Sequence, residues 1–269
     1  MTSLVDIADV SLSYGGADGT LAVRGLNLQV NQGEMVAVVG PSGCGKSSLM
    51  KLVTGLLRPT AGSVSVAGKA VDGPLKIVGM AFQNASLLPW RTTMGNLMLP
   101  LEIVEPYRSR FSRDKAEFEA EARKLLTTVG LGEFERRFPW QLSGGMQQRA
   151  SLCRALIHKP SLLMLDEPFA ALDAFTREEL WDVLQAIWME RSFTTILVTH
   201  DLREAVYLAD TVHVMSARPG RVIASHKVNL PRPRTLETSF LPEFGALVQE
   251  LRELIRIQRG GPAEMEHAA

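Results

Sequence analysis

Three short apolar runs constrain the fold of this 269-residue chain more than any other feature. The runs are Met35–Val39, Ser161–Leu165 and Thr194–Thr199, and none of them contains a charged residue. Near-continuous apolar runs of this length are typical of strands that are covered on both faces in a parallel sheet. Helical patterns separate the runs, so the sequence predicts an α/β core with a mostly parallel sheet.

Apolar residues recur at helical spacing after the first run and before the third. They are Leu49, Leu52, Val53 and Leu56 after the first run, and Leu180, Leu184 and Ile187 before the third. We expect both helices to pack on the sheet.

Two further segments depart from the pattern of a parallel core. Alternation in Gly62–Gly68 and a turn at Asp72–Pro74 predict antiparallel strands in the N-terminal stretch and over residues 62–82, which would form an antiparallel β subdomain. Between about 90 and 158 the pattern is helical, and Gly130 ends an apolar stripe, so we expect an α-helical subdomain there. The stripe consists of Phe118, Ala122, Leu125, Leu126 and Val129.

The C-terminal part of the chain has a pattern of its own. We expect one domain over residues 1–235, followed over residues 236–269 by an amphipathic helix and a disordered tail that starts at Gly260. The helix is indicated by Phe244, Leu247, Val248, Leu251, Leu254 and Ile255.

Composition excludes several classes of protein. Twenty-nine basic and 29 acidic side chains give a net charge of +0, so no overall field draws the chain to nucleic acid or to an anionic membrane. The two cysteines, Cys44 and Cys153, are too few for a disulfide framework and indicate a reducing compartment. The N-terminus lacks the pattern of a signal peptide, and no apolar run is long enough to span a bilayer, so we expect a cytoplasmic protein whose membrane role would need a partner.

The residues directly after the first apolar run fit the phosphate-loop pattern, in the strand-to-helix context that makes such a match credible. The loop consists of Gly40, Pro41, Ser42, Gly43, Cys44, Gly45, Lys46 and Ser47. Its backbone N–H groups would surround the phosphates of a nucleotide, Lys46 would reach the β and γ phosphates, and Ser47 would offer a hydroxyl to Mg²⁺. No base is suggested for Cys44, which is more simply a small loop residue than a nucleophile.

The second apolar run ends in two acids, Asp166 and Glu167. An acid at the carboxyl end of a strand, in a chain with a phosphate loop, is well placed for Mg²⁺, and we assign that role to Asp166. Adjacent strand residues point to opposite faces, which argues against a glycosidase acid pair. Glu167 is then the candidate general base for the attacking water, although a solvated or helix-capping acid would look the same on its own.

A third motif, Leu142–Arg149, begins a helix at Ser143 with two glycines behind it. A helix start of this kind is a second anion site. Together with the phosphate loop and the terminal Asp-Glu strand, it resembles the ATP-binding cassette (ABC) ATPases over about residues 1–225. The resemblance implies a dimer in which this motif faces the phosphate loop of another cassette, so that ATP lies between two chains. Met146 departs from the glutamine that is common in the family at this position.

The resemblance implies roles at the nucleotide site for further residues. Tyr14 would stack on adenine or else pack within the first strand, Gln83 would sense Mg²⁺ and the attacking water, and His200 would contact the γ-phosphate. Asp173 matches the loop that crosses the dimer interface. Nucleotide contacts are also implied for Ser48, Gly144, Gly145 and Gln147.

Other segments resemble the ATPases of nitrate, sulfonate and taurine importers. They are Leu87–Arg91, Met215–Val222 and Leu230–Arg234. The resemblance implies an integral-membrane permease as partner, a second ATPase subunit, a periplasmic solute-binding protein that acts indirectly, and a place at the cytoplasmic face of the membrane. Leu87, Leu88 and Trp90 would either dock on the permease or pack inside the helical subdomain.

Two other functions stay open at this point. The chain could serve an exporter or a lipid-handling complex, which would differ from an importer in needing no binding protein. A nucleic-acid-associated ATPase of this family is less favoured, because the chain has one cassette, no heptad run and no net charge.

Overall fold

The computed structural model describes residues 2–15 and 19–259. They fall into two compact units. Unit 1 joins Met1–Leu75 to Thr194–Ala269, and unit 2 is Lys76–Phe193. The tail predicted to be disordered, from Gly260 onward, lies outside the described residues.

Unit 1 contains an antiparallel sheet with the strand order β2-β1-β4-β5. Its strands are β1 (Ser3–Tyr14), β2 (Thr20–Asn31), β4 (Ala61–Val66) and β5 (Lys69–Ala70). In β4 the buried Val64 and Val66 follow the alternation expected of a strand with one covered face, whereas the register shifts of β1 interrupt its alternation, so that neighbouring Leu4 and Val5 are both buried. The predicted antiparallel strands near the N-terminus and at 62–70 are therefore present.

The second sheet of unit 1 is mostly parallel and has the order β10-β9-β3-β8 within the unit. The strands are β3 (Met35–Val39), β8 (Thr194–Val198), β9 (Thr211–Met215) and β10 (Val222–Lys227). β3 runs parallel to both of its neighbours, while β10 pairs antiparallel with β9. Every residue of β3, β8 and β9 is buried, which explains why two of these strands are continuous apolar runs in the sequence.

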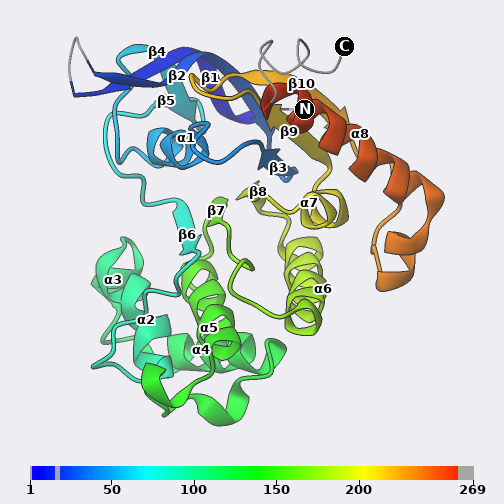
Figure 1. The fold of residues 1–269 in the computed structure, drawn as a ribbon. Coiled ribbons are helices and arrows are strands. Elements are labelled where there is room, and N and C mark those ends of the chain that lie inside the picture. The colour runs from blue at the N-terminus through cyan, green and yellow to red at the C-terminus, as the bar shows by residue number, and fades with distance from the viewer. Residues whose placement is uncertain (1, 16–18, 260–269) are drawn as a thin grey trace, which may run out of the picture. The chain divides into compact units, whose positions relative to one another are not determined.

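Three helices complete the described part of unit 1 (Figure 1). Helix α1 (Lys46–Val53) follows β3 and packs under the antiparallel sheet, and α7 (Leu202–Leu208) follows β8. Helix α8 (Pro242–Arg259), which follows a 3₁₀ turn at Leu236–Phe240, runs beside α7 and β9. Of the stripe predicted for this C-terminal helix, Phe244, Val248 and Leu251 are buried.

Arg234 ties the segment before α8 to the end of α7. The side chain is 1% exposed, and its guanidinium donates to the carbonyls of Val206, Tyr207, Ala209 and Val228 at 2.7–3.3 Å. In the opposite direction, the hydroxyl of Tyr207 donates to the carbonyl of Arg234 at 2.8 Å. The last carbonyls of a helix have no partner within the helix, so Arg234 acts as the C-terminal cap of α7.

Unit 2 is mainly helical and holds one parallel strand pair. Its elements are β6 (Val78–Phe82), α2 (Thr93–Ile103), α3 (Tyr107–Arg110), α4 (Lys115–Thr128), α5 (Gly144–Leu156), β7 (Leu162–Asp166) and α6 (Ala174–Arg191), with 3₁₀ turns at Gly132–Phe134 and Pro139–Gln141. Helices α2, α4 and α5 share one buried cluster that contains the predicted α4 stripe. The helical segment predicted for about residues 90–158 lies within this unit, beside β6, β7 and α6.

Two details of the sequence-based fold are wrong. Residues 78–82 do not extend the antiparallel sheet but form β6, which pairs parallel with β7. A parallel partner is brought alongside by a long crossover, and β6 and β7 are separated by the whole helical segment. Leu56 lies beyond α1, which ends at Val53 before a left-handed glycine, Gly55 (φ 76°).

Candidate nucleotide-binding site

The phosphate loop in unit 1 leaves the buried strand β3, makes a turn in which Cys44 N donates to the Pro41 carbonyl at 3.3 Å, and enters α1 at Lys46. Gly45 has φ 106°, a backbone conformation that residues with a side chain rarely adopt. A Cβ at this position would lie 2.7 Å from Cγ1 of Val23. Only glycine fits this position. Ser42, Gly43 and Ser47 are exposed, so the outer rim of the loop and the first turn of α1 can be reached by an anion.

Lys46 is buried within the loop that it belongs to. Its ammonium donates to the carbonyls of Gly40 at 2.8 Å and Pro41 at 3.0 Å. The loop therefore closes around one positive charge, which together with the N-terminus of α1 makes this end of β3 attractive to phosphate.

Cys44 lies against the same lysine, with Sγ 3.9 Å from the ammonium nitrogen. Burial raises the pKa of the Cys44 thiol, and the charge of Lys46 only partly opposes that effect. The thiol stays protonated at neutral pH, which agrees with a small packing residue and not with a nucleophile.

Tyr14 ends β1 and is 41% exposed. Its hydroxyl lies 3.1 Å from Oγ of Ser48 on α1, and either oxygen can donate. This bond fixes the ring relative to the phosphate loop while leaving part of the ring open to solvent. In this structure the hydroxyl of Ser48 therefore contacts the hydroxyl of Tyr14.

His200 lies at the same edge of the sheet as the phosphate loop. It comes two residues after β8, which is parallel to β3 with Val198 opposite Val38, and the Thr199 N–H donates to the Val38 carbonyl at 3.2 Å. Parallel strands have their carboxyl ends at one edge, so both features face the ligand side of this sheet. His200 is exposed, and Asp201 behind it caps α7 by accepting from Arg203 N at 2.9 Å.

Unit 2 brings Gln83, Asp166 and Glu167 to the end of a second parallel pair. β6 and β7 are in register with Phe82 opposite Asp166, so Gln83 and Glu167 both follow directly at the same edge. Asp166 and Glu167 are half-buried, and Gln83 is exposed.

Glu167 has a left-handed backbone, with φ 47°. This conformation costs a residue other than glycine about 1–2 kcal/mol, and such strain is concentrated at functional sites. It also means that the strand ends at Asp166, so the alternation argued from the sequence does not set the direction of the Glu167 side chain.

Gln148 is a positioning residue that sequence reasoning missed. It is buried on α5, and its amide donates to the Phe82 carbonyl at 2.7 Å, which holds the backbone next to Gln83. Its neighbour Gln147, chosen from the sequence as a nucleotide contact, uses its amide nitrogen to bond the carbonyls of Pro139 at 3.0 Å and Leu142 at 3.2 Å. Two adjacent glutamines carry no sequence signal that separates these roles.

Ser143 and Asp173 are the N-caps of α5 and α6. The Ser143 hydroxyl accepts from Met146 N at 3.3 Å, and Asp173 accepts from Thr176 N at 3.0 Å. The hydrogen bonds from Thr176 lower the pKa of the Asp173 carboxyl. Both helix starts line one cavity of about 430 Å³, together with Gly144 and Gly145. Two converging helix N-termini favour an anion in this cavity.

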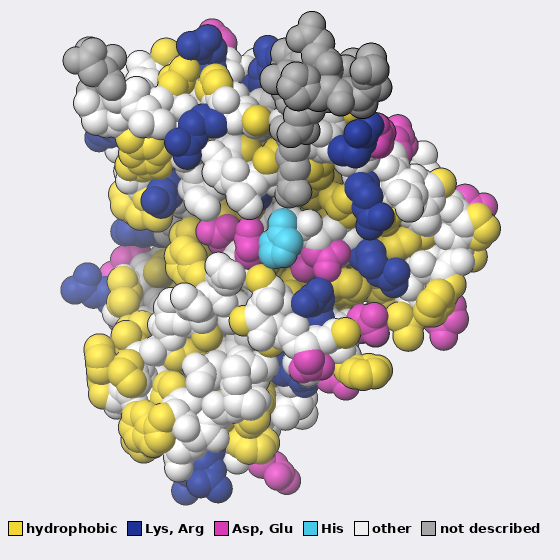
Figure 2. Space-filling model, viewed as in Figure 1, with side chains coloured by type: hydrophobic (Ala, Val, Ile, Leu, Met, Phe, Trp, Pro, Cys, Tyr) yellow, Lys and Arg dark blue, Asp and Glu magenta, His cyan; other side chains and the backbone are white. Residues whose placement is uncertain are grey.

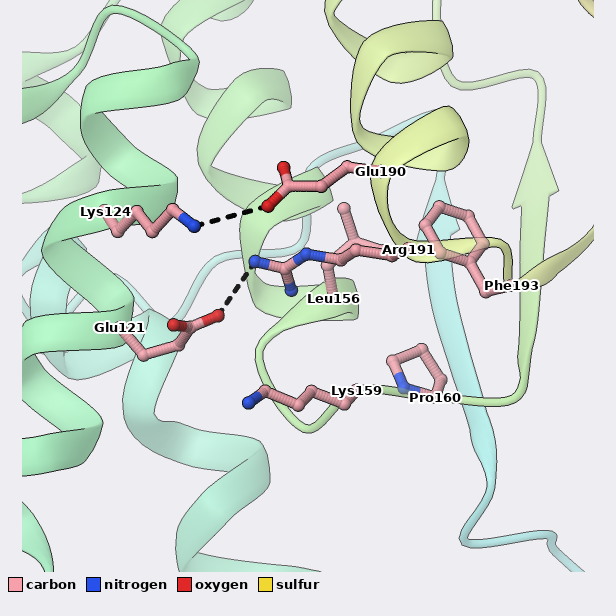
Figure 3. Close-up of a pocket in the computed structure, with 8 residues that line it drawn as sticks. All are labelled: Glu121, Lys124, Leu156, Lys159, Pro160, Glu190, Arg191 and Phe193. Atoms are coloured by element: carbon pink, nitrogen blue, oxygen red, sulfur yellow. Dashed lines mark hydrogen bonds and ion pairs between the residues drawn. The ribbon is translucent and has the colours of Figure 1, made fainter.

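A second cavity in unit 2, of about 380 Å³, contains none of the predicted site residues (Figure 3). Four of its charged side chains form two pairs: Arg191 with Glu121 at 2.8 Å, and Lys124 with Glu190 at 3.3 Å. These pairs connect α4 to α6, and we regard the cavity as a packing feature of the helices.

Comparisons with known proteins agree with this geometry. The sequence profile of the ABC transporter family matches residues 23–170. The aliphatic sulfonates import ATP-binding protein SsuB of Bacillus licheniformis is 44% identical over 91% of this chain and 93% of its own length. The taurine import ATP-binding protein TauB of Yersinia pestis is 41% identical over 82% of this chain and 84% of its own length.

Among solved structures, a dimeric ATP-binding cassette in a post-hydrolysis state, bound to ADP and Pi, gives a TM-score of 0.74 at 30% identity and covers 84% of this chain and 100% of that one. These comparisons confirm the family and the α/β fold class that the sequence predicts. The chain belongs to the ABC transporter family and is one of its ATPase subunits.

Proposed function

We propose that this chain is the ATP-hydrolysing subunit of an importer for a sulfonate, taurine or a related small organic solute. The observation that carries the proposal is the phosphate loop, which surrounds the buried ammonium of Lys46 at the edge of a parallel sheet. The identity to import ATP-binding proteins over most of the chain supports the direction of transport.

Mg²⁺ fits the residues assigned to it. In the described part of the chain no three His, Cys, Asp or Glu side chains gather into a metal site of their own. Beside a bound nucleotide, Mg²⁺ is commonly held by protein oxygens that include one carboxylate, and phosphate and water complete its shell. Ser47, Gln83 and Asp166 would supply those protein oxygens, and bound Mg²⁺ would neutralise charge on the β and γ phosphates.

Three further side chains contact the attacking water, the γ-phosphate or the base. Glu167 accepts the proton of the attacking water, His200 donates to the γ-phosphate, and Tyr14 stacks on the base. The strained backbone of Glu167 and the exposure of His200 at a strand end support these assignments.

The cavity between Ser143 and Asp173 receives the γ-phosphate side of an ATP that is held by the phosphate loop of a second chain. Its two helix N-termini support that role, and the similar solved cassette is a dimer with bound ADP and Pi. Closure of two such chains on two ATP molecules, followed by loss of the γ-phosphate, would drive a membrane permease through its cycle.

The permease partner would contact unit 2 at the cytoplasmic face of the membrane. Within the described residues, no helix has both the length and the apolar character required to cross a bilayer. Leu87 packs against the helical cluster, whereas Trp90 is 71% exposed, and Figure 2 shows hydrophobic side chains reaching the surface among the helices of this unit. Docking is therefore assigned to Trp90, and packing to Leu87.

Lys46→Ala tests the proposed nucleotide site. The substitution removes a charge that would bond two phosphates, so ATP affinity should fall about 10- to 100-fold. Titration of the full chain with ATP measures it, and Lys51→Ala, on the same helix but exposed, serves as control. Equal affinity for ATP in wild type and Lys46→Ala would refute the proposed function.

Trp90→Ser tests the docking surface. An exposed tryptophan is a typical centre of an interface, so the variant should keep its basal ATP hydrolysis while solute uptake per ATP falls about tenfold or more. Reconstituted vesicles that contain the permease and its binding protein provide the readout. Ile257→Ser removes an exposed apolar side chain from α8 and should leave uptake unchanged. Unaltered uptake with Trp90→Ser would remove Trp90 from the interface.

A further inference from the structure

The turn between β9 and β10 lies directly on the phosphate loop. Nε of Arg218 donates to the carbonyl of Gly43, in the middle of the loop, at 3.3 Å. A Cβ built on Gly43 would lie 3.6 Å from a terminal nitrogen of the same guanidinium. Arg218 thus rests against the outer side of the loop, 175 residues away in sequence.

Gly220 brings the same turn into contact with the neighbouring loop residue. A Cβ on Gly220 would overlap the carbonyl oxygen of Cys44, so the two backbones approach more closely than any side chain would allow. At the other end of the contact, a Cβ on Gly40 would lie 2.9 Å from the Met215 carbonyl. The turn therefore packs against the loop over several residues.

The turn is itself held in place. Gly220 N donates to the Ala22 carbonyl at 2.9 Å, and Arg24 N donates to the Gly220 carbonyl at 3.1 Å, which ties the turn to β2. Within the turn, the Ser216 hydroxyl bonds the carbonyl of Ala217 at 2.9 Å and accepts from Arg221 N at 3.1 Å. A support that is fixed at both ends can hold the loop in one shape.

We infer that Arg218 is a positioning residue of the nucleotide site, which holds the Gly43 peptide of the phosphate loop in the orientation that receives a nucleotide polyphosphate. A loop that is ordered before the ligand arrives loses less entropy on binding, so the gain appears as affinity. The inference depends on the proposed function, because it concerns the same phosphate site. It gives the segment Met215–Val222 a physical role that the sequence pattern alone does not provide.

Arg218→Met keeps the length of the side chain and removes the donor. Affinity for ATP should fall about three- to tenfold, the range expected for one hydrogen bond, and KM for ATP should rise in proportion while kcat changes less than about twofold. Arg218→Lys can still donate to the Gly43 carbonyl and should recover most of the loss. Arg218 is exposed, so folding should be unaffected, with a melting temperature equal to that of wild type.

Arg221→Met is the matched control, because it removes one positive charge from the same turn. In the part of the chain that the structure describes, the Arg221 guanidinium is exposed, and the hydrogen bonds of this residue involve its backbone alone. This variant should bind ATP like wild type. Equal losses in Arg218→Met and Arg221→Met would show that charge and not the bond matters, and no loss in Arg218→Met would also overturn the inference.

Lys46→Ala, measured in the same titration, separates a failure at Arg218 from a failure of the whole site. A loss in Lys46→Ala without a loss in Arg218→Met contradicts only the role of Arg218. No loss in either variant contradicts the proposed nucleotide site, and the inference fails with it.

Discussion

Glu167→Gln should reduce ATP turnover about 100- to 10,000-fold while leaving ATP binding near that of wild type. The amide keeps the shape of the side chain but cannot accept the proton of the attacking water. Lys46 and the phosphate loop, which lie in unit 1, are untouched by the change. Binding and chemistry should therefore separate in this variant.

The same variant should accumulate as a dimer in the presence of Mg·ATP. In the proposed arrangement the γ-phosphate bridges the phosphate loop of one chain and the Ser143 helix of the other, and a γ-phosphate that is not removed keeps the bridge intact. Wild-type protein should form the dimer only briefly.

Phosphate release and size-exclusion chromatography with Mg·ATP measure the two effects together. Glu117→Gln, which removes an exposed carboxylate from α4, is the matched control and should behave like wild type in both. Turnover of Glu167→Gln within about tenfold of wild type would contradict a general base at this position. A variant that stays monomeric at saturating ATP would contradict the bridge.

The sequence predicts the strands β3, β7 and β8 well because almost every residue in them is buried. These strands have neighbours on both faces, which leaves a continuous apolar run as their only pattern. β6 was placed in the wrong sheet for a related reason: Val78–Phe82 is short and apolar, and nothing in such a segment states whether its partner is parallel or antiparallel.

The sequence predicts the local structure of the proposed site where that structure needs a fixed order of residues. A phosphate loop and a serine-capped helix depend on glycines and caps at set spacings, so the sequence predicts the tight turn at Gly45 and the helix cap at Ser143 that the structure contains, while their contacts with nucleotide stay predictions. The sequence does not single out Gln148 or Arg218. Each acts by donating to a backbone carbonyl far away in the chain, and a carbonyl is present at every position, so the acceptor leaves no trace in the sequence.

Arg234 is the most strongly buried example of such a donor. In the sequence it is part of Leu230–Arg234, a segment that resembles importer ATPases and would ordinarily place arginines at the surface. In the structure its guanidinium caps α7, the helix that follows His200. Burial lowers the pKa of Arg234 to about 10, which still leaves the side chain charged at neutral pH.

Arg234→Met should lower the free energy of unfolding by about 3–5 kcal/mol. Methionine fills a similar volume but leaves the carbonyls of Val206, Tyr207 and Ala209 buried without their donor, at about 1–3 kcal/mol each. The substitution also removes the cost of burying the charge of Arg234, which offsets part of the loss from the three carbonyls. The net loss of about 3–5 kcal/mol is the range expected when one partner of a buried charged network is removed.

Thermal unfolding measures the effect, and for a chain of this size the midpoint should fall by about 10 °C. Arg252→Met, on the exposed side of α8, should shift it by less than about 2 °C, the usual result for a surface position. Because α7 begins two residues after His200, loosening of its C-terminal end should spare ATP binding by the phosphate loop at temperatures well below the midpoint. If Arg234→Met and the wild type have the same unfolding midpoint, the four carbonyls do not depend on the Arg234 guanidinium. The segment Leu230–Arg234 would then act through its exposed residues and not as the C-terminal cap of α7.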